Sequence, residues 1–234
     1  NVVVENGILR IAHNRALGIG PKNAQAANNA NNANPHIHLD GSAGNLTIPA
    51  DVTFRTSNQR AGALINDAGT NTILGMVHLT SGDGDTAIVS SAGKLTLAGN
   101  VYPPTDTSRR LRLWGDGDGE IAGVIATGAT ADLPLFKEKG KGTWTLTGAN
   151  TYSGVTTVND GTLILGGTDG RIAGAAETAT GGTLIVTNAP DANNPDRLAD
   201  SAGVTLNGGT LAFTHAGGAA NYSEAAGALS VGSG

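Results

Sequence analysis

Hydrophobic and polar residues alternate in short stretches along the chain, without the spacing of a helix over ten residues or more. One five-residue phrase recurs eight times: Gly, any residue, Leu or Trp, any residue, then an aliphatic residue or Phe. Successive side chains of a strand point to opposite faces, so the third and fifth positions share one face. All sixteen side chains at those two positions are large and apolar, but only five of the sixteen at the second and fourth are apolar. Each copy therefore predicts a short strand with one buried face.

The third and fifth positions together predict a core ladder. Its members are Leu9, Ile11, Leu46, Ile48, Leu95, Leu97, Trp144, Leu146, Leu163, Leu165, Leu184, Val186, Leu211, Phe213, Leu229 and Val231. The first glycines of successive copies are 37, 49, 49, 19, 21, 27 and 18 residues apart. The short intervals cluster near twenty, and the long ones are about twice that, as expected if an intervening copy had degenerated. A sandwich has no reason to repeat one phrase, whereas in a solenoid equivalent strands stack at ~4.8 Å.

The sequence therefore predicts an all-β fold, a right-handed parallel β-helix (solenoid) of roughly eleven coils. We expect residues 1–234 to form a single solenoid segment of a larger protein, because the pattern is under way at both ends. Residues 21–35 include an Asn/Ala-rich run, which predicts a protruding low-complexity loop. Uncapped coils expose strand edges, so further coils of the same polypeptide or identical subunits are the expected partners, with end-to-end fibres as the specific hypothesis.

Composition removes several function classes. The chain has 36 Gly and 8 Pro but no Cys, which excludes disulfides, thiolate zinc sites and cysteine nucleophiles. Its net charge is −5, and its 14 Lys and Arg are scattered, so we expect no nucleic-acid partner. No apolar run approaches ~20 residues, so no membrane-spanning helix is predicted. The sequence also indicates no cofactor.

A more specific signal lies in residues 140–165. This segment reads Gly140-Lys-Gly-Thr-Trp-Thr-Leu-Thr-Gly-Ala-Asn-Thr-Tyr-Ser-Gly-Val-Thr-Thr-Val-Asn-Asp-Gly-Thr-Leu-Ile-Leu165. It resembles the autotransporter passenger-associated β-strand repeat nearly position by position, departing at Val155, where that family usually has a second Gly. The resemblance implies a right-handed parallel β-helix that is exported and displayed outside the bacterial cell, a location that is extracellular or at the cell surface.

Acidic residues offer a weak metal candidate. Asp116, Asp118 and Glu120 alternate with glycines, and carboxylates at alternate positions can wrap a calcium ion. They lack the spaced bidentate Glu of an EF-hand and the period of a calcium-binding β-roll. A similar turn holds Asp83 and Asp85. We favour solvated corners for both turns, so no metal is predicted.

Two histidines are a second candidate. His36 and His38 flank Ile37, and with Asp40 they could form a metal site on one strand face. Ile37 and Leu39 are the natural core pair, which places both imidazoles toward solvent. The solvent-facing interpretation is the one we favour.

Support for catalysis is poor. The chain lacks a Gly-x-Ser-x-Gly elbow, a phosphate-binding glycine loop and a His-Glu-x-x-His motif. Trp144 and Phe213 are assigned to the core. The remaining candidate sugar platforms, Trp114, Tyr102, Tyr152 and Tyr222, are far apart in sequence. Two basic clusters, Lys137–Lys141 and the arginines Arg109, Arg110 and Arg112, are expected on solvated strand faces.

The preferred function is therefore a non-catalytic, extracellular structural or adhesive solenoid: a stalk, surface coat or fibre segment of a large exported bacterial protein. Surface glycans or other cells are possible adhesion partners. Two alternatives stay open, a surface polysaccharide-degrading lyase or hydrolase and a glycan-binding phage tail spike. An enzyme would need paired carboxylates in a groove, and a tail spike would need an obligate trimer.

Overall fold

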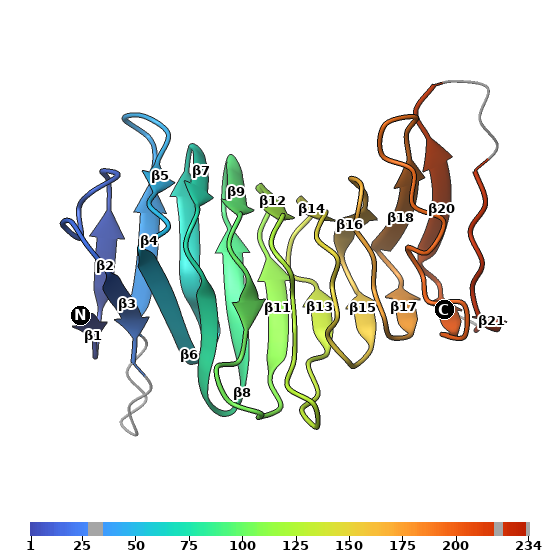
Figure 1. Ribbon diagram of the computed structural model, residues 1–234, viewed down its shortest axis with the longest axis horizontal. Helices are drawn as coiled ribbons and strands as arrows, with labels where there is room; N and C mark the ends of the chain where they lie inside the picture. Colours follow the sequence, from blue (N-terminus) through green and yellow to red (C-terminus); the bar gives the residue numbers. More distant parts are fainter. Residues whose placement is uncertain (28–34, 218–221, 233–234) are drawn as a thin grey trace.

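Parallel strands stack along one axis to form the molecule (Figure 1). The computed structural model describes residues 1–27, 35–217 and 222–232, apart from the side chains at 57–61 and 81–83. Every pair of neighbouring strands within these ranges is parallel, the coils number about nine, and none of the described segments is helical. The predicted all-β parallel solenoid is therefore confirmed, and its coil number is corrected from eleven to nine.

Two sheets form the walls. The eight-stranded sheet lies in the upper part of Figure 1, and the thirteen-stranded sheet lies mostly below it. The first consists of β5 (Thr47–Ile48), β7 (Thr70–Ile73), β9 (Lys94–Leu97), β12 (Asp118–Ile121), β14 (Thr143–Leu146), β16 (Gly161–Leu165), β18 (Gly182–Asn188) and β20 (Thr210–His215). The second consists of β1 (Val2–Val4), β2 (Ile8–Ile11), β3 (Lys22–Ala26), β4 (His36–Asp40), β6 (Val52–Ala68), β8 (Val77–Ser90), β10 (Val101–Tyr102), β11 (Arg110–Trp114), β13 (Leu135–Lys137), β15 (Thr156–Val158), β17 (Ala176–Ala179), β19 (Val204–Asn207) and β21 (Leu229–Val231).

Coil length explains the lower count. Leu95 pairs with Asn71 on one side and Gly119 on the other, so each of these steps is 24 residues (95 − 71 and 119 − 95). Later steps are shorter: Trp144 pairs with Leu163, 19 residues on (163 − 144). Each 49-residue interval between copies thus holds two coils. Their intervening copies, at Asn71 and Gly119, keep the strand but have lost the leucine.

The repeated phrase does not mark a single wall. Six copies form strands of the eight-stranded sheet, but the first copy forms β2 and the last forms β21, both in the thirteen-stranded sheet. The same alternation suits any wall that has one face inside. Equivalence of all eight copies, which the repeat pattern predicts, is therefore wrong for these two.

The predicted ladder is buried through the middle of the stack. Nine of its members, from Ile11 to Leu165, are at most 3% exposed, as are Leu184 and Val186. Register explains this, since Leu163 pairs with Leu184 and Leu165 with Val186. Leu9 and Leu211, on strands near the two ends, are partly buried against the core.

The last coil differs from the prediction. Phe213, Leu229 and Val231 are expected inside but are 58%, 61% and 75% exposed. The reason is their position on β20 and β21, the last strands of the two sheets, beyond which the described chain has no further strand to cover them.

The predicted loop over 21–35 also needs correction at its start. Lys22–Ala26 is β3, which pairs with β1 and β6. Ala24 and Ala26 point inward and are fully buried, while Asn23 and Gln25 alternate with them. Small alanines fill this wall because Phe54 of the next coil pairs with Ala24. The rest of the expected loop, 28–34, lies outside the described residues.

Close backbone contact at one corner explains part of the glycine content. Gly75, Gly99, Gly123 and Gly148 follow one another in successive coils. A Cβ at Gly99 would lie 2.1 Å from the carbonyl oxygen of Gly75, and the next two glycines repeat this at 2.2 and 2.3 Å. A side chain at any of these three positions would force neighbouring coils apart. We call this set the glycine column.

Candidate functional site

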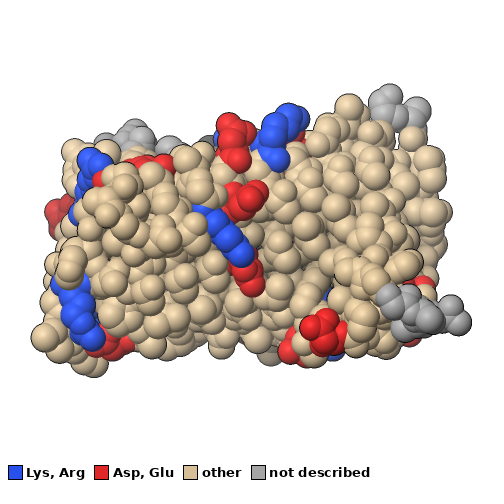
Figure 2. Space-filling model, turned by 90° about the horizontal axis from the view of Figure 1, so that it is seen from above, with Lys and Arg blue, Asp and Glu red and all other residues tan. Residues whose placement is uncertain are grey.

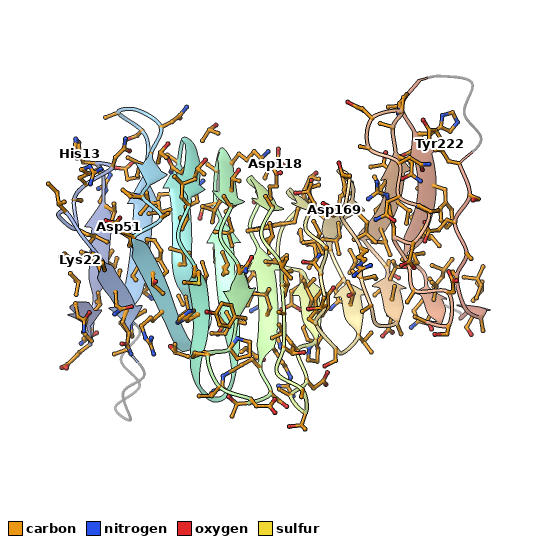
Figure 3. The ribbon with its side chains drawn as sticks, in the orientation of Figure 1. His13, Lys22, Asp51, Asp118, Asp169 and Tyr222 are labelled. Atoms are coloured by element: carbon orange, nitrogen blue, oxygen red, sulfur yellow. The ribbon has the colours of Figure 1, made fainter. Side chains whose placement is uncertain are left out.

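The acidic turn at the start of β12 faces the next coil. Asp116 accepts a hydrogen bond from the backbone N–H of Lys141 (2.9 Å), and Asp118 accepts one from Thr143 (3.0 Å). Glu120 pairs with Lys94 at 2.6 Å. Asp118 lies at the upper rim (Figure 3). These carboxylates link adjacent coils, and no cluster of three metal-ligating side chains is found in the described part of the chain.

The histidine pair and Asp40 have three separate partners. The Nδ1 atom of His38 lies 2.8 Å from a carboxylate oxygen of Asp67, while Nδ1 of His36 contacts the carbonyl of Gly62. Both rings alternate with the fully buried Ile37 and Leu39.

Asp40 is engaged at its own corner. It accepts hydrogen bonds from Ser42 and from the guanidinium of Arg10. Hydrogen bonds from the Ser42 side chain and backbone, then from Arg10, lower the pKa of Asp40 from 3.8 to about 2. The carboxylate is therefore held in its charged form by Ser42 at its own corner and by Arg10 of the neighbouring coil, rather than directed toward the histidines.

A network of charged and aromatic side chains covers β8, β11 and β13. Arg112 pairs with Asp85 at 3.0 Å and also contacts Glu138. Glu138 accepts a hydrogen bond from the indole N–H of Trp114 (3.1 Å), and Lys139 lies 3.8 Å above that ring. Trp114 is buried beneath these partners, so its ring face is not offered to a sugar.

The three tyrosines proposed as sugar platforms lie in different surroundings. Tyr152 is completely buried, its hydroxyl lies 2.6 Å from Thr156, and burial raises its pKa well above the usual value. Tyr102 contacts His78 (3.0 Å). Tyr222 lies at the C-terminal end (Figure 3), where it borders, with the exposed Phe213, a pocket of about 240 Å³.

The burial of Lys137 shows that the expectation of solvated basic clusters is wrong for this residue. Lys137 is fully buried, since it lies two residues after Leu135 on the same strand and faces inward like that residue. Its ammonium group donates to the carbonyls of Gly140 (2.7 Å) and Asp160 (3.0 Å), and burial lowers its pKa. Strand parity could have revealed this position, but its charge pointed to the surface.

Arg197 is a second buried cation, which sequence reasoning missed. It donates to Asn188 (2.8 Å) and to the carbonyls of Gly170 (2.8 Å), Gly167 (2.6 Å) and Ala192 (2.8 Å). These bonds tie two loops of different coils together. The flanking residues Asp196 and Leu198 show no alternation from which an inward-pointing arginine could be predicted.

The outer face of the eight-stranded sheet carries uncharged columns toward the C-terminal end. One column contains Thr143, Thr162, Thr183 and Thr210, and its neighbour contains Thr145, Ile164, Ile185 and Ala212. Seen from above, charged side chains are few over much of the right-hand part of the molecule (Figure 2). The face offers hydroxyl and methyl groups rather than charge.

Both ends of the stack present open strand edges within the described ranges. At the C-terminal end these are β20 and β21, with the exposed side chains named above. At the N-terminal end, Val3 of β1 and Ile8 of β2 are exposed. No helix of the described chain has the length and hydropathy needed to cross a membrane.

These features define the class of protein: a parallel β-solenoid whose polar groups join coil to coil. Residues 139–165 match the family model of the passenger-associated-transport-repeat. The resemblance seen in the sequence is confirmed, and the chain carries an autotransporter passenger repeat, formed by β14, β15 and β16.

A curated relative supports the same assignment. The chain is similar to the adhesin BmaC autotransporter of Brucella suis biovar 1 (strain 1330), with 34% identity over 133 residues. That match covers 55% of this chain but only 4% of the relative, so the chain spans a small part of that protein's length. No solved structure matches the chain.

Proposed function

We propose that the chain is a non-catalytic, secreted or cell-surface segment of a large exported bacterial protein, in which it acts as a rigid stalk with an adhesive role. The observation that carries this proposal is the passenger repeat built in register into the solenoid, with Trp144 paired to Leu163 and Leu163 to Leu184. The adhesin named above shares sequence with this chain and supports the adhesive part.

The proposed action is mechanical. Each coil is hydrogen-bonded to its neighbours along two walls, and its apolar side chains fill the interior. Because each coil contacts only the adjacent ones, the length of the rod grows with coil number without change in the local contacts. Such a rod can carry a binding face away from the cell surface.

The ends supply the proposed partners. The edges of β20 and β21 at one end and of β1 and β2 at the other can accept a further coil or an identical subunit. A contact between two different ends is heterologous, and a heterologous contact whose rotation does not close a ring generates fibres. We propose end-to-end association of this kind.

Light scattering across a concentration series tests the association. The average mass of the purified chain is expected to rise with concentration, and Val231→Lys, at the open end, should reduce the rise. Thr183→Lys on the outer face is the matched control and should leave it unchanged. A monomer at every concentration contradicts end-to-end association.

Adhesion is tested separately by displaying the chain on a non-adherent bacterium through a heterologous translocator. We expect binding to host cells above that of the empty translocator, and a destabilised display variant, Leu163→Asp, should lose it. Equal binding by both displayed forms contradicts an adhesive role of the folded solenoid. Glycan turnover that is lost in Asp116→Asn or Asp118→Asn would instead favour the enzyme.

A further inference from the structure

Three buried cations can be compared by the partners that the fold gives them. Arg197 donates four hydrogen bonds and Lys137 two, all to carbonyl or amide oxygens of other residues. Arg109 is only 7% exposed, yet its one described guanidinium hydrogen bond joins Nη1 to the carbonyl of its neighbour Ser108 (2.7 Å). Its Nε is buried without a partner. Among the described residues, no carboxylate forms an ion pair with Arg109.

Strand parity and a glycine place this guanidinium beside a pocket. Arg109 directly precedes β11 and shares the inward parity of Leu111. One coil earlier, Arg110 pairs with Asp85, which puts Gly84 opposite Arg109. Glycine has no side chain to fill that space. The result is a pocket of about 230 Å³ lined by Gly84, Ser108, Arg109, Arg110, Asp132 and Pro134.

An unpaired buried guanidinium is unfavourable, since burial removes its water without supplying a counter-ion. The guanidinium fork matches carboxylates and sulfates with two parallel hydrogen bonds, so a planar or tetrahedral anionic group is the partner that suits Arg109. Arg110 adds a second positive charge at the wall, with its side chain 56% exposed and 3.5 Å from Asp85.

The remaining polar groups narrow the ligand class. The Ser108 hydroxyl accepts a hydrogen bond from the backbone N–H of Asp132 (3.0 Å), so its own proton can be donated to a ligand. Asp132, an exposed residue that lines the pocket, adds a negative charge that opposes a small multiply charged anion, and a carboxylate accepts hydrogen bonds from hydroxyl groups. A ligand with one anionic group and several hydroxyls satisfies both features.

We infer that this pocket, which we call the Arg109 pocket, binds an acidic sugar residue, with its carboxylate or sulfate on Arg109 and its hydroxyls on Asp132 and Ser108. This inference deepens the adhesive part of the proposed function by naming the ligand class, and it rests on that part for its biological meaning. The binding itself is measured on the purified chain, so its failure and the failure of cell adhesion are separate results.

Thermal unfolding with added ligand tests the inference. The probes are trigalacturonate, a chondroitin sulfate disaccharide, inorganic sulfate and neutral cellotriose. We expect a saturable rise in Tm with a carboxylated or a sulfated sugar, and the first two probes distinguish these sources. The rise in Tm with cellotriose or inorganic sulfate should be at least tenfold smaller. Equal effects of inorganic sulfate would reduce the pocket to a simple ion site and overturn the sugar assignment, as would equal effects of cellotriose.

Arg109→Met separates a binding role from a structural one. The variant should lose the ligand-induced rise in Tm while its own Tm stays equal or increases, because an unpaired buried charge has been removed. Arg171→Met, which alters an exposed arginine paired with Asp196 at 3.7 Å, should respond to ligand like the parent chain. Retained ligand binding in Arg109→Met overturns the inference.

A second variant covers the case in which Arg109→Met does not fold. Arg109→Lys keeps the charge but loses the planar fork, so it should bind the acidic sugar at least fivefold more weakly than the parent chain. Unchanged binding by Arg109→Lys overturns the assignment of Arg109 as the anion-binding group.

Discussion

The coils from β14 to β18 and those from β7 to β12 fill the same interior column with different residues. In the first region Trp144, Leu163 and Leu184 stack in register. In the second, Asn71 and Gly119 take the equivalent positions on either side of Leu95. The difference teaches that the solenoid requires a filled column with satisfied polar groups, not a leucine at every coil.

Each exception is matched to its neighbour. A Cβ at Gly119 would lie only 2.3 Å from the indole ring of Trp144, so the glycine provides the space that the tryptophan occupies. Asn71 accepts a hydrogen bond from the backbone N–H of Leu46 (2.7 Å) and donates to Asn66 (2.6 Å). The copies that look degenerate in the sequence are complementary in the structure.

The largest effect is expected for a charge placed in the interior column of the coils from β14 to β18. Leu163→Asp places a carboxylate in a fully buried column and should cost about 4 kcal/mol or more, enough to unfold or aggregate the chain. Thr162→Asp, one residue away on the outer face, should change stability by about 0.5 kcal/mol. Urea unfolding measures both, and similar losses for the two variants contradict the inside/outside assignment.

Restoring the phrase at Gly119 should be harmful rather than helpful. Gly119→Leu would drive a side chain into the Trp144 ring and should destabilise the chain by roughly 3 kcal/mol. Adding Trp144→Leu to that variant frees the space and should recover about half of the loss, leaving about 1.5 kcal/mol. A stabilised Gly119→Leu single variant would show that the copy is merely decayed.

Asn71→Leu should have the next effect. The leucine fits the pattern of the column but leaves the Leu46 N–H and the side-chain amide oxygen of Asn66 without their partner, at a cost of about 2 kcal/mol. Asn45→Ala, which removes an exposed side chain that accepts from the Thr70 backbone (2.9 Å), is a surface control with a smaller cost. Equal stability of Asn71→Leu and the parent chain refutes the structural role of the amide.

The smallest effect is expected at Asp40, at the end of β4. Because the folded-state pKa of Asp40 is lowered from 3.8 to about 2, its carboxylate adds stability above pH 4 that is lost as the pH falls through 2. Asp40→Asn should therefore be less stable than the parent chain at pH 7, and the difference should vanish near pH 2. Urea unfolding at a series of pH values checks this, and a gap that is independent of pH contradicts it.

Much of the fold follows from the alternation of side chains in a strand. Parity alone places Leu95, Leu163 and Leu184 inside, because a period of two leaves no other choice once one face is apolar. Coil length is harder to predict from the sequence, since the two copies of the phrase at Asn71 and Gly119 lack the leucine. The fit of these two residues depends on side chains one coil away. The alanines of β3 are too small to signal a buried wall against the asparagines around them.

The candidate sites were less predictable for the same physical reason. The partners of Asp116 and Asp118 are backbone groups of the next coil, so no local pattern reveals that the carboxylates are already engaged. Lys137 has the parity of a core residue but the chemistry of a surface one. The Arg109 pocket depends on Gly84 lying opposite the arginine, and that register exists only after folding.

The glycine column has a consequence for how such a rod can diversify. At Gly99, Gly123 and Gly148 a methyl group would clash with the backbone of the preceding coil. Substitutions at these positions would force the coils apart, so sequence changes must accumulate elsewhere. Duplication of an entire coil, in contrast, carries its own corner glycine along, so the close backbone contact at this corner is kept with both neighbouring coils. Growth by copying whole turns, with novelty confined to outward faces and connecting bends, is the route that this spine leaves open.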